Sequence, residues 1–247
     1  MRIYKYIKLF FHLIFFVNLS KTFFVNFKML PLTQAVKLPI FVYGKMQFRS
    51  MKGIIEIEGK VYTGMIKIGR NRSYVTTSIQ LSTWIIDGKI IFHGTVNFYY
   101  GSYLLVAPNA VLTIGRKTSL GNVKLICFQS ITIGENVRFA WECQLMDTSF
   151  HYLEQENGEI QPLTESITIG SYTWIGNRSS ITKGAIIPTY SIITSNSVVN
   201  KDMSSYGTCC LFAGQPAKFK KNGIKRVYDM NFERELDKKF GYERIHL

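Results

Sequence analysis

One histidine stands out as a group that could do chemistry. His151 lies in "MDTSFHYLEQENGEIQPLTES", a polar and acidic stretch, whereas His12 lies in an apolar N-terminal run, His93 in weakly patterned sequence, and His246 next to the last residue. An imidazole can take a proton from a hydroxyl group at neutral pH, and such general-base help is worth roughly 10²–10⁴-fold in rate. A loop histidine can equally have no chemical role, so the interpretation depends on its surroundings.

A general base also needs an acceptor that orients its other ring nitrogen. Asp147 and Glu142 are close to His151 in the sequence, and a backbone carbonyl could serve as well. Asp147 can alternatively fix the turn of the loop through hydrogen bonds to the backbone. Both carboxylates are therefore candidate partners of the base.

The sequence around this stretch repeats with a period of six. Between residues 167 and 199 a branched aliphatic residue recurs at every sixth position, namely at Ile169, Ile175, Ile181, Ile187, Ile193 and Val199. A helix would spread these side chains around its surface, whereas a strand keeps them on one face. Strands usually span only about 5–6 residues, so short strands separated by corners are expected. Fixed six-residue periodicity is typical of a parallel β-helix.

The same rhythm occurs upstream, and it is interrupted once. It runs through Ile114, Leu120 and Ile126 and then, after a slip of one residue, through Ile133, Phe139 and Leu145. Glycine or a turn-forming residue often follows the aliphatic residue, which suits tight corners. The interruption lies between Leu145 and Ile169 and contains His151. We expect an extruded loop there, and loops on rigid scaffolds often carry function.

Three motifs give the chain a family resemblance. Apolar-Gly hexads, followed by "SYTWIGNRSS", "SNSVVNKDM" and "FAGQPAK", resemble the hexapeptide-repeat acyltransferases, which are related to the maltose, galactoside and xenobiotic O-acetyltransferases. The resemblance spans about residues 110–221. It implies an all-β fold, a left-handed parallel β-helix with three hexads per coil, which is an exception to the usual right-handed crossover. It also implies that His151 is the catalytic base.

The resemblance further assigns the substrate and donor sites. It implies contacts with acetyl-CoA, the acyl donor, by Trp174, Ser195, Asn200, Lys201, Gly214, Pro216, Ala217 and Lys218. Asn200 stands where the family often has Thr. Lys218, Lys220 and Lys221 could hold the 3′-phosphate by charge. Asn122 and Glu142 are the candidates for binding the acceptor, and no metal is expected.

Composition and the chain ends limit the other possibilities. The net charge of +14 implies an anionic partner, but no nucleic-acid-binding module accompanies it, so we expect no nucleic acid. The four cysteines have neither metal-ligand spacing nor a disulfide pattern, which favours a cytoplasmic protein.

The apolar run from Leu9 to Val17 is too short to span a bilayer. Its flanking lysines and phenylalanines predict either a helix lying on an anionic membrane or a helix packed on the solenoid or a neighbouring subunit.

These observations divide the chain into three parts. Residues 1–52 are expected to form an amphipathic or capping segment, and residues 31–66 to include a lead-in that covers the open end of the first coil. Residues 53–207 should form the β-helix, with the loop at 147–166, and residues 208–247 a coenzyme A-contacting tail whose helix caps the other end.

The favoured function is an acetyl-CoA-dependent O-acetyltransferase that acts on a sugar or lipid-linked saccharide in surface polysaccharide biosynthesis. The family resemblance implies a homotrimer with sites between subunits. The cysteine pattern and the basic, apolar N-terminal segment favour a location in the cytoplasm, with peripheral contact to the inner face of the cell membrane. The alternatives are a non-catalytic scaffold or membrane-associated binding module, and a ping-pong route through Cys143. A metal-dependent carbonic anhydrase on this fold would need about three histidines, and His151 is alone in the repeats.

Overall fold

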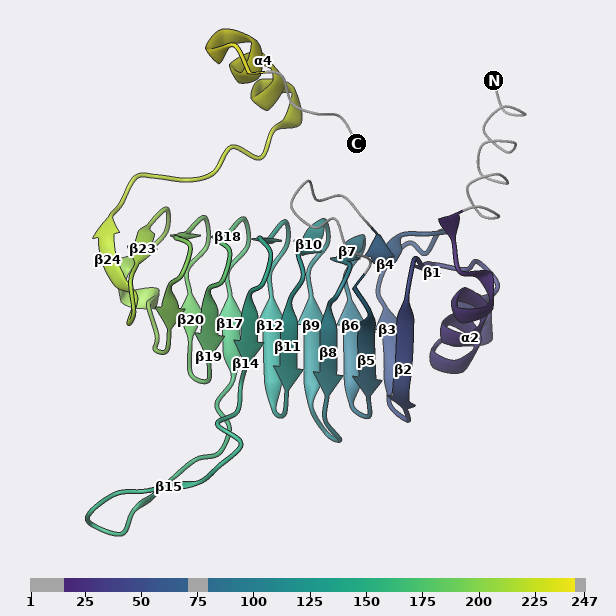
Figure 1. Cartoon of the computed structure of the whole chain (residues 1–247), viewed down its shortest axis with the longest axis horizontal. Helices are drawn as coiled ribbons and strands as arrows, with labels where there is room; N and C mark the ends of the chain where they lie inside the picture. Colours follow the sequence, from purple (N-terminus) through teal and green to yellow (C-terminus); the bar gives the residue numbers. More distant parts are fainter. Residues whose placement is uncertain (1–15, 71–79, 243–247) are drawn as a thin grey trace.

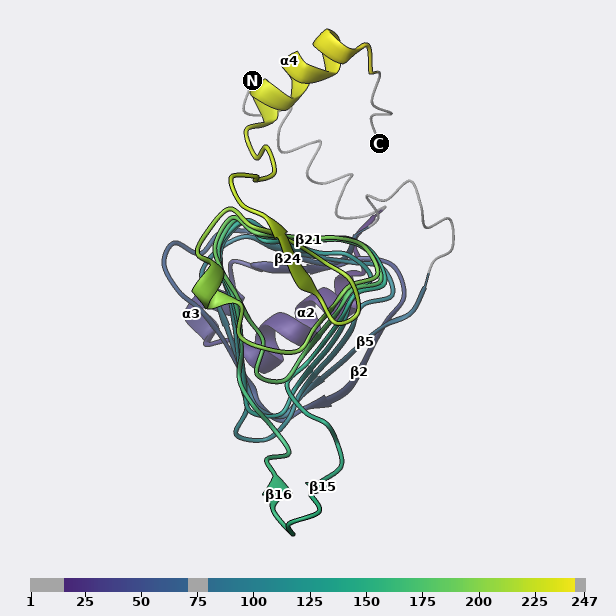
Figure 2. The ribbon, with the colours of Figure 1, turned by 90° about the vertical axis from the view of Figure 1, so that its left-hand side faces the viewer.

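Three parallel β-sheets form the faces of a triangular stack of coils. The computed structural model describes residues 16–70 and 80–242, and Figures 1 and 2 show the stack from the side and along its axis. The first sheet contains β1 (Ile40–Val42), β4 (Ile66–Arg70), β7 (Val96–Tyr99), β10 (Thr118–Leu120), β13 (Arg138–Phe139), β18 (Trp174–Ile175), β21 (Ile192–Ile193), β23 (Leu211–Ala213) and β24 (Lys218–Lys221).

The other two faces have the same construction. The second sheet contains β2 (Met46–Met51), β5 (Ser82–Ile86), β8 (Tyr103–Val106), β11 (Lys124–Cys127), β14 (Gln144–Met146), β19 (Ser180–Thr182) and β22 (Val198–Val199). The third sheet contains β3 (Ile54–Ile57), β6 (Lys89–Phe92), β9 (Val111–Ile114), β12 (Ser130–Ile133), β17 (Ile167–Ile169) and β20 (Ile186–Ile187). The chain visits the three faces in turn, and three parallel sheets arranged in this way are typical of the predicted left-handed parallel β-helix, which confirms the fold class.

The register of the late coils matches the hexad period. Ile169 pairs with Ile187, Ile175 with Ile193, and Ile181 with Val199, so equivalent positions of successive coils are eighteen residues apart. All six side chains point inward and are buried. Each hexad therefore supplies one face of the triangle, and three hexads complete one coil.

One predicted core position is wrong. Ile126 lies half-exposed on β11, whereas its neighbours Leu125 and Cys127 are fully buried. Side chains of a strand alternate between its two faces, so a shift of one residue exchanges inside and outside. Leu125 pairs with Leu145 of the next coil, so the inward positions Leu120, Leu125 and Ile133 are five and eight residues apart, rather than six and seven as predicted through Ile126.

The glycines at the corners are required by the closeness of the next coil. A Cβ atom on Gly170 would lie 2.4 Å from the Thr189 nitrogen, and one on Gly176 would lie 2.5 Å from the Ser195 nitrogen. The left-handed backbone conformation falls elsewhere, at the third residue after the aliphatic one. At these corners φ lies between 56° and 61° for Lys117, Asn136, Glu142, Tyr172, Arg178, Tyr190 and Asn196.

A helix closes the N-terminal end of the stack. Helix α2 (Leu19–Met29) packs on β1 and β2, and the short helix α3 (Leu32–Ala35) follows it. The buried Asn26 donates from Nδ2 to the Ile40 carbonyl at 2.7 Å and accepts from the Ile40 nitrogen at 3.1 Å. The Val42 nitrogen donates to Thr22 Oγ1 at 3.0 Å. For this segment, packing on the solenoid is observed, and residues 1–15 lie outside the described residues.

The coils extend beyond the boundaries expected from the sequence. They begin with β1 at Ile40, so residues 40–52 belong to the stack and α2, rather than residues from 31 onward, covers its end. At the C-terminal end, the 3-10 helix η1 (Ser204–Tyr206) precedes the antiparallel β23–β24 hairpin, which lies on the last coil. Helix α4 (Met230–Phe240) has no buried residue and lies beside the stack rather than on its end, which corrects the expected cap.

The corner geometry predicts a large effect of a single methyl group. We expect Gly176→Ala to lower the free energy of unfolding by about 1–3 kcal/mol, because the added Cβ overpacks the backbone of the next coil. Chemical denaturation measures this change. Asn200→Ala changes the corresponding position after Val199 in an exposed place and should stay within about 0.5 kcal/mol. Equal effects of the two substitutions would contradict this account of the corner.

Candidate functional site

The interruption of the hexads forms a hairpin that leaves the stack. β15 (Leu153–Glu154) and β16 (Ile160–Gln161) pair antiparallel, and Figure 1 shows the hairpin projecting away from the coils between β14 and β17. His151 lies exposed near the base of this hairpin. The Phe150 ring packs edge-on against Phe128 of the stack, with centroids 5.4 Å apart. Ser149 Oγ donates to the His151 carbonyl at 3.0 Å. These contacts hold the backbone of His151 and leave its imidazole accessible.

Asp147 anchors the loop where it leaves the stack. Its buried carboxylate accepts hydrogen bonds from the backbone nitrogens of Phe128, Gln129 and Ser130, at 2.7, 2.8 and 2.9 Å. Among the described residues it makes no hydrogen bond to His151. The Asp147 side chain therefore holds the turn at 128–130 against the loop. Of the two roles predicted for Asp147, this is the one that fixes the loop through the backbone, not the one that orients the base. Burial, together with this carboxylate, raises the pKa of the neighbouring Cys127 thiol far above its usual range.

The base of the His151 loop lies at the same corner of the triangle as Lys201. The Glu165 nitrogen donates to the Asp147 carbonyl at 3.0 Å, and the Gly184 nitrogen donates to the Glu165 carbonyl at 3.3 Å. One coil further on, the Ile186 nitrogen donates to the Lys201 carbonyl at 3.4 Å. This corner, between the second and third sheets, thus brings the His151 loop together with the donor-site candidates Asn200 and Lys201.

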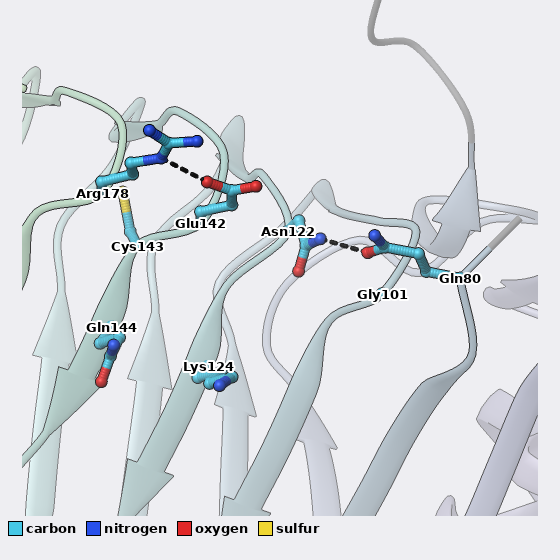
Figure 3. A pocket seen from close by; sticks show the side chains of 8 residues that line it. All are labelled: Gln80, Gly101, Asn122, Lys124, Glu142, Cys143, Gln144 and Arg178. Carbon is cyan, nitrogen blue, oxygen red and sulfur yellow. Dashed lines mark hydrogen bonds and ion pairs between the residues drawn. The ribbon is translucent and has the colours of Figure 1, made fainter. Parts of the chain in front are cut away.

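The acceptor candidates Asn122 and Glu142 lie at a different corner, between the first and second sheets. They line a polar cavity of about 450 Å³, which Figure 3 shows from close by. Arg178 Nε contacts Glu142 Oε2 at 2.6 Å, and Asn122 Nδ2 donates to Gln80 Oε1. Gln80 and Arg178 are lining residues that the sequence reasoning missed. The signal for Arg178 was its place three residues after Ile175, where the left-handed corner residue projects outward.

Cys143 also lines this cavity but is a poor nucleophile. Its side chain is buried, and Sγ donates to the Gly176 carbonyl at 3.2 Å. Burial raises the pKa of the Cys143 thiol to about 11, so the reactive thiolate is scarce at neutral pH. This geometry disfavours the ping-pong route.

Further donor-site candidates follow the same corner toward the C-terminus. Ser195 Oγ donates to Asn177 Oδ1 at 2.5 Å. The segment from Gly214 to Ala217 runs beside β22, where the Val198 nitrogen donates to the Gly214 carbonyl at 3.0 Å. The Ala217 nitrogen donates to the Val198 carbonyl at 2.7 Å, and Pro216 is exposed. Trp174 stands apart on the outer face of the first sheet and is 40 % exposed.

The cationic side chains fit a phosphate-bearing donor. Lys201, Lys218, Lys220 and Lys221 are all exposed, and among the described residues none of their ammonium groups makes an ion pair. Flexible ammonium groups of this kind bind phosphates as point charges. Within residues 16–70 and 80–242, no three His, Cys, Asp or Glu side chains converge so as to hold a metal ion.

Comparison with known proteins places this arrangement in context. No family model matches the sequence. The galactoside O-acetyltransferase of Escherichia coli (strain K12) is 32% identical over 110 residues, which cover 44% of this chain and 50% of that protein. The match therefore spans about half the length of this curated relative.

The chain also resembles solved structures. The polySia specific acetyltransferase NeuO matches with a TM-score of 0.58 and 21% identity, covering 82% of this chain and 85% of the other. A maltose O-acetyltransferase from Clostridium difficile 630 matches with a TM-score of 0.36 and 17% identity, covering 84% of each chain. The resemblance to hexapeptide-repeat acyltransferases is confirmed, and the match to NeuO supports the fold.

The anchoring role of Asp147 predicts a stability effect. In Asp147→Asn one carboxylate oxygen becomes an NH₂ group, which cannot accept from the backbone donors of 128–130. A buried donor left without a partner costs about 1–3 kcal/mol, so we expect a loss of that size in the free energy of unfolding. Hydrogen exchange should also accelerate at the amides of 128–130. Glu154→Gln on the exposed hairpin is the matched control, and similar exchange in both variants would contradict the anchor.

Proposed function

We propose that this chain, which resembles the hexapeptide-repeat acetyltransferases, is an acetyl-CoA-dependent O-acetyltransferase. The acceptor is a sugar hydroxyl of a saccharide or lipid-linked saccharide used in surface polysaccharide synthesis. The observation that carries the proposal is the similarity to galactoside O-acetyltransferase over 110 residues. An accessible imidazole on the hairpin that leaves the stack supports it.

The reaction requires a proton acceptor at the hairpin. A sugar hydroxyl becomes a competent nucleophile when its proton is removed as it attacks a carbonyl carbon. When bound, acetyl-CoA supplies that carbon as a thioester. His151 takes the proton of the hydroxyl through a ring nitrogen, and the departing thiolate is then protonated. Lys201, Lys218, Lys220 and Lys221 hold the phosphates of the donor, while Asp147 keeps the base of the hairpin in place.

We further propose that the working unit is a homotrimer with sites between neighbouring chains. The His151 hairpin leaves one corner of the triangle, whereas Ser195 and the segment from Gly214 to Ala217 line another, and Trp174 lies on the outer face of the first sheet. A second chain packed alongside would bring donor residues of one subunit next to the hairpin of the other.

The proposed base is tested by release of free thiol. With acetyl-CoA and a panel of sugar and lipid-linked sugar acceptors, wild-type protein should release thiol, and His151→Ala should lower kcat by about 10²–10⁴-fold. His93→Ala is the matched control, because the exposed His93 lies on the stack with its Nδ1 2.8 Å from Glu58 Oε2 and has no proposed role. Equal rates for wild type and His151→Ala would exclude the base. Absence of turnover with every acceptor would favour the non-catalytic scaffold.

A membrane-associated role has a specific observation in its favour. Phe23, Phe24 and Phe27 of α2 are 48%, 47% and 49% exposed, on the side of the helix away from the buried Val25. Lys28 lies in the last turn of α2. Aromatic side chains beside lysines match the interface of an anionic bilayer. We therefore propose a cytoplasmic protein that attaches peripherally to the inner face of the membrane. Among the described residues, no helix has the length and apolar character needed to cross a bilayer.

The attachment is tested by co-sedimentation with lipid vesicles. We expect the Phe23→Ser, Phe27→Ser double variant to bind vesicles containing phosphatidylserine at least about 10-fold more weakly than wild type, because two apolar side chains no longer enter the interface. Phe232→Ser on α4 is the matched control, since Phe232 is 49% exposed as well. Unchanged binding by the double variant, or equal binding of wild type to neutral vesicles, would exclude this surface.

A further inference from the structure

The C-terminal segment covers a cleft on the outer face of the first sheet. After β24 the chain turns back along the stack toward α4, as Figure 1 shows. We call residues 225–233 the strap. The cleft between the strap and the sheet has a volume of about 440 Å³. Its walls include Arg138 and Trp174 from the sheet, and Arg226, Tyr228 and Glu233 from the strap.

Aromatic contacts hold the strap against the stack. The Tyr228 ring packs edge-on against Tyr172, with centroids 5.5 Å apart, and Tyr172 stacks on Tyr190 of the next coil at 4.8 Å. Lys225 Nζ lies 5.5 Å from the centre of the Tyr190 ring. The cleft is therefore a built feature of the fold, in which both walls are fixed by packing.

The cleft carries an excess of positive charge. Arg138 lies between Ser119 and Trp174 in the register of the sheet, and its Nη1 donates to Ser119 Oγ at 3.0 Å. Burial and the neighbouring Arg226 lower the pKa of the Arg138 guanidinium. The facing carboxylate of Glu233 lies 3.6 Å from Arg226 Nη2, and Arg138 has no ion pair among the described residues. A bound anion would relieve the repulsion between the two guanidinium groups.

A second polar group in the cleft lacks a partner. The hydroxyl group of Tyr228 is buried and makes no hydrogen bond within the described part of the chain. Burial raises the pKa of this hydroxyl to about 12, so it is protonated and can donate. A buried hydroxyl without a partner costs free energy, and structures rarely retain one without a reason. An oxyanion placed between the guanidinium groups could accept its hydrogen bond.

We propose that the strap cleft binds an acidic sugar unit of the acceptor, which rests on the proposed sugar O-acetyltransferase function. The oxyanion of that unit, a carboxylate or a phosphate, pairs with Arg138 and Arg226 and accepts from the Tyr228 hydroxyl. Guanidinium groups match planar oxyanions through paired hydrogen bonds. Trp174 offers an aromatic face at the rim against which a sugar ring can pack, and Glu233 can accept from a sugar hydroxyl.

The proposal is tested by calorimetric binding in the absence of acetyl-CoA, so that it does not depend on turnover. The probes are a galacturonic acid trimer, a galactose trimer and galactose 6-phosphate. We expect wild type to bind at least one acidic probe and to bind the neutral trimer at least about 10-fold more weakly. Arg138→Gln should weaken acidic binding by about 10-fold or more, and Tyr228→Phe by several-fold. The stronger of the two acidic probes identifies the oxyanion as carboxylate or phosphate.

Two controls separate binding from folding and from the donor site. Tyr228→Phe removes an unpartnered hydroxyl, so its Tm without sugar should equal or exceed that of wild type. Arg49→Gln removes an exposed arginine on β2, in the second sheet and away from the strap, and it should bind acidic probes like wild type.

Three results would overturn the proposal: no binding of either acidic probe, equal affinity for the neutral trimer, or unchanged affinity of Arg138→Gln. Loss of acetyl-CoA binding in Arg138→Gln with unaffected sugar binding would assign the cleft to the donor instead. The thiol-release assay tests the proposed function separately, so failure of one does not imply failure of the other.

Discussion

Successive coils are joined by backbone hydrogen bonds between parallel strands, which fixes their separation at roughly 4.8 Å. At that distance each inward aliphatic side chain rests on the equivalent one of the next coil, as Ile175 does on Ile193. The same distance leaves no room for a Cβ atom at the residue that follows, which is why Gly170 and Gly176 stand there. Each corner is completed by a left-handed residue two positions later, whose side chain projects outward. The repeat thus dictates both the packed interior and the positions from which functional side chains can reach solvent.

Where one residue type fills every equivalent position, the sequence alone predicts the fold. The series from Ile169 to Val199 has this property, and the structure confirms its register. Earlier coils are longer and less regular: Phe92 pairs with Ile114, twenty-two residues away. Their strands at residues 40–51 carry no hexad signal, so the beginning of the stack was placed too late. At Ile126 both neighbours of the predicted residue are apolar, and the pattern alone could not decide which face was inside.

The candidate site was also predicted from the sequence only in part. The loop that carries His151 is visible as a break in the repeat. Each motif of the donor site is a continuous stretch of sequence and can be recognised by itself. The corner of the triangle at which each motif lies depends on the number of residues in every preceding corner. No local sequence pattern gives that number. The cleft between Arg138 and Tyr228 was missed because the two residues are ninety positions apart and meet only when the chain turns back after β24. Similarly, Asp147 could be proposed as a partner of the base, but the backbone donors of 128–130 that it binds come from the preceding coil.

The two ends of the stack differ from each other, and this difference limits the end-to-end association of copies into fibres. A solenoid whose last strand offers free backbone groups can add another copy end to end, since the added strands would continue the same ladders. Here the side chains of Thr22 and Asn26 bond the backbone of β1 at one end. At the other end β24 runs antiparallel to β23 and exposes lysine side chains to any incoming strand. On the first sheet, neither end of the stack therefore offers a matching template, so this face favours association at the sides of the triangle rather than along its axis.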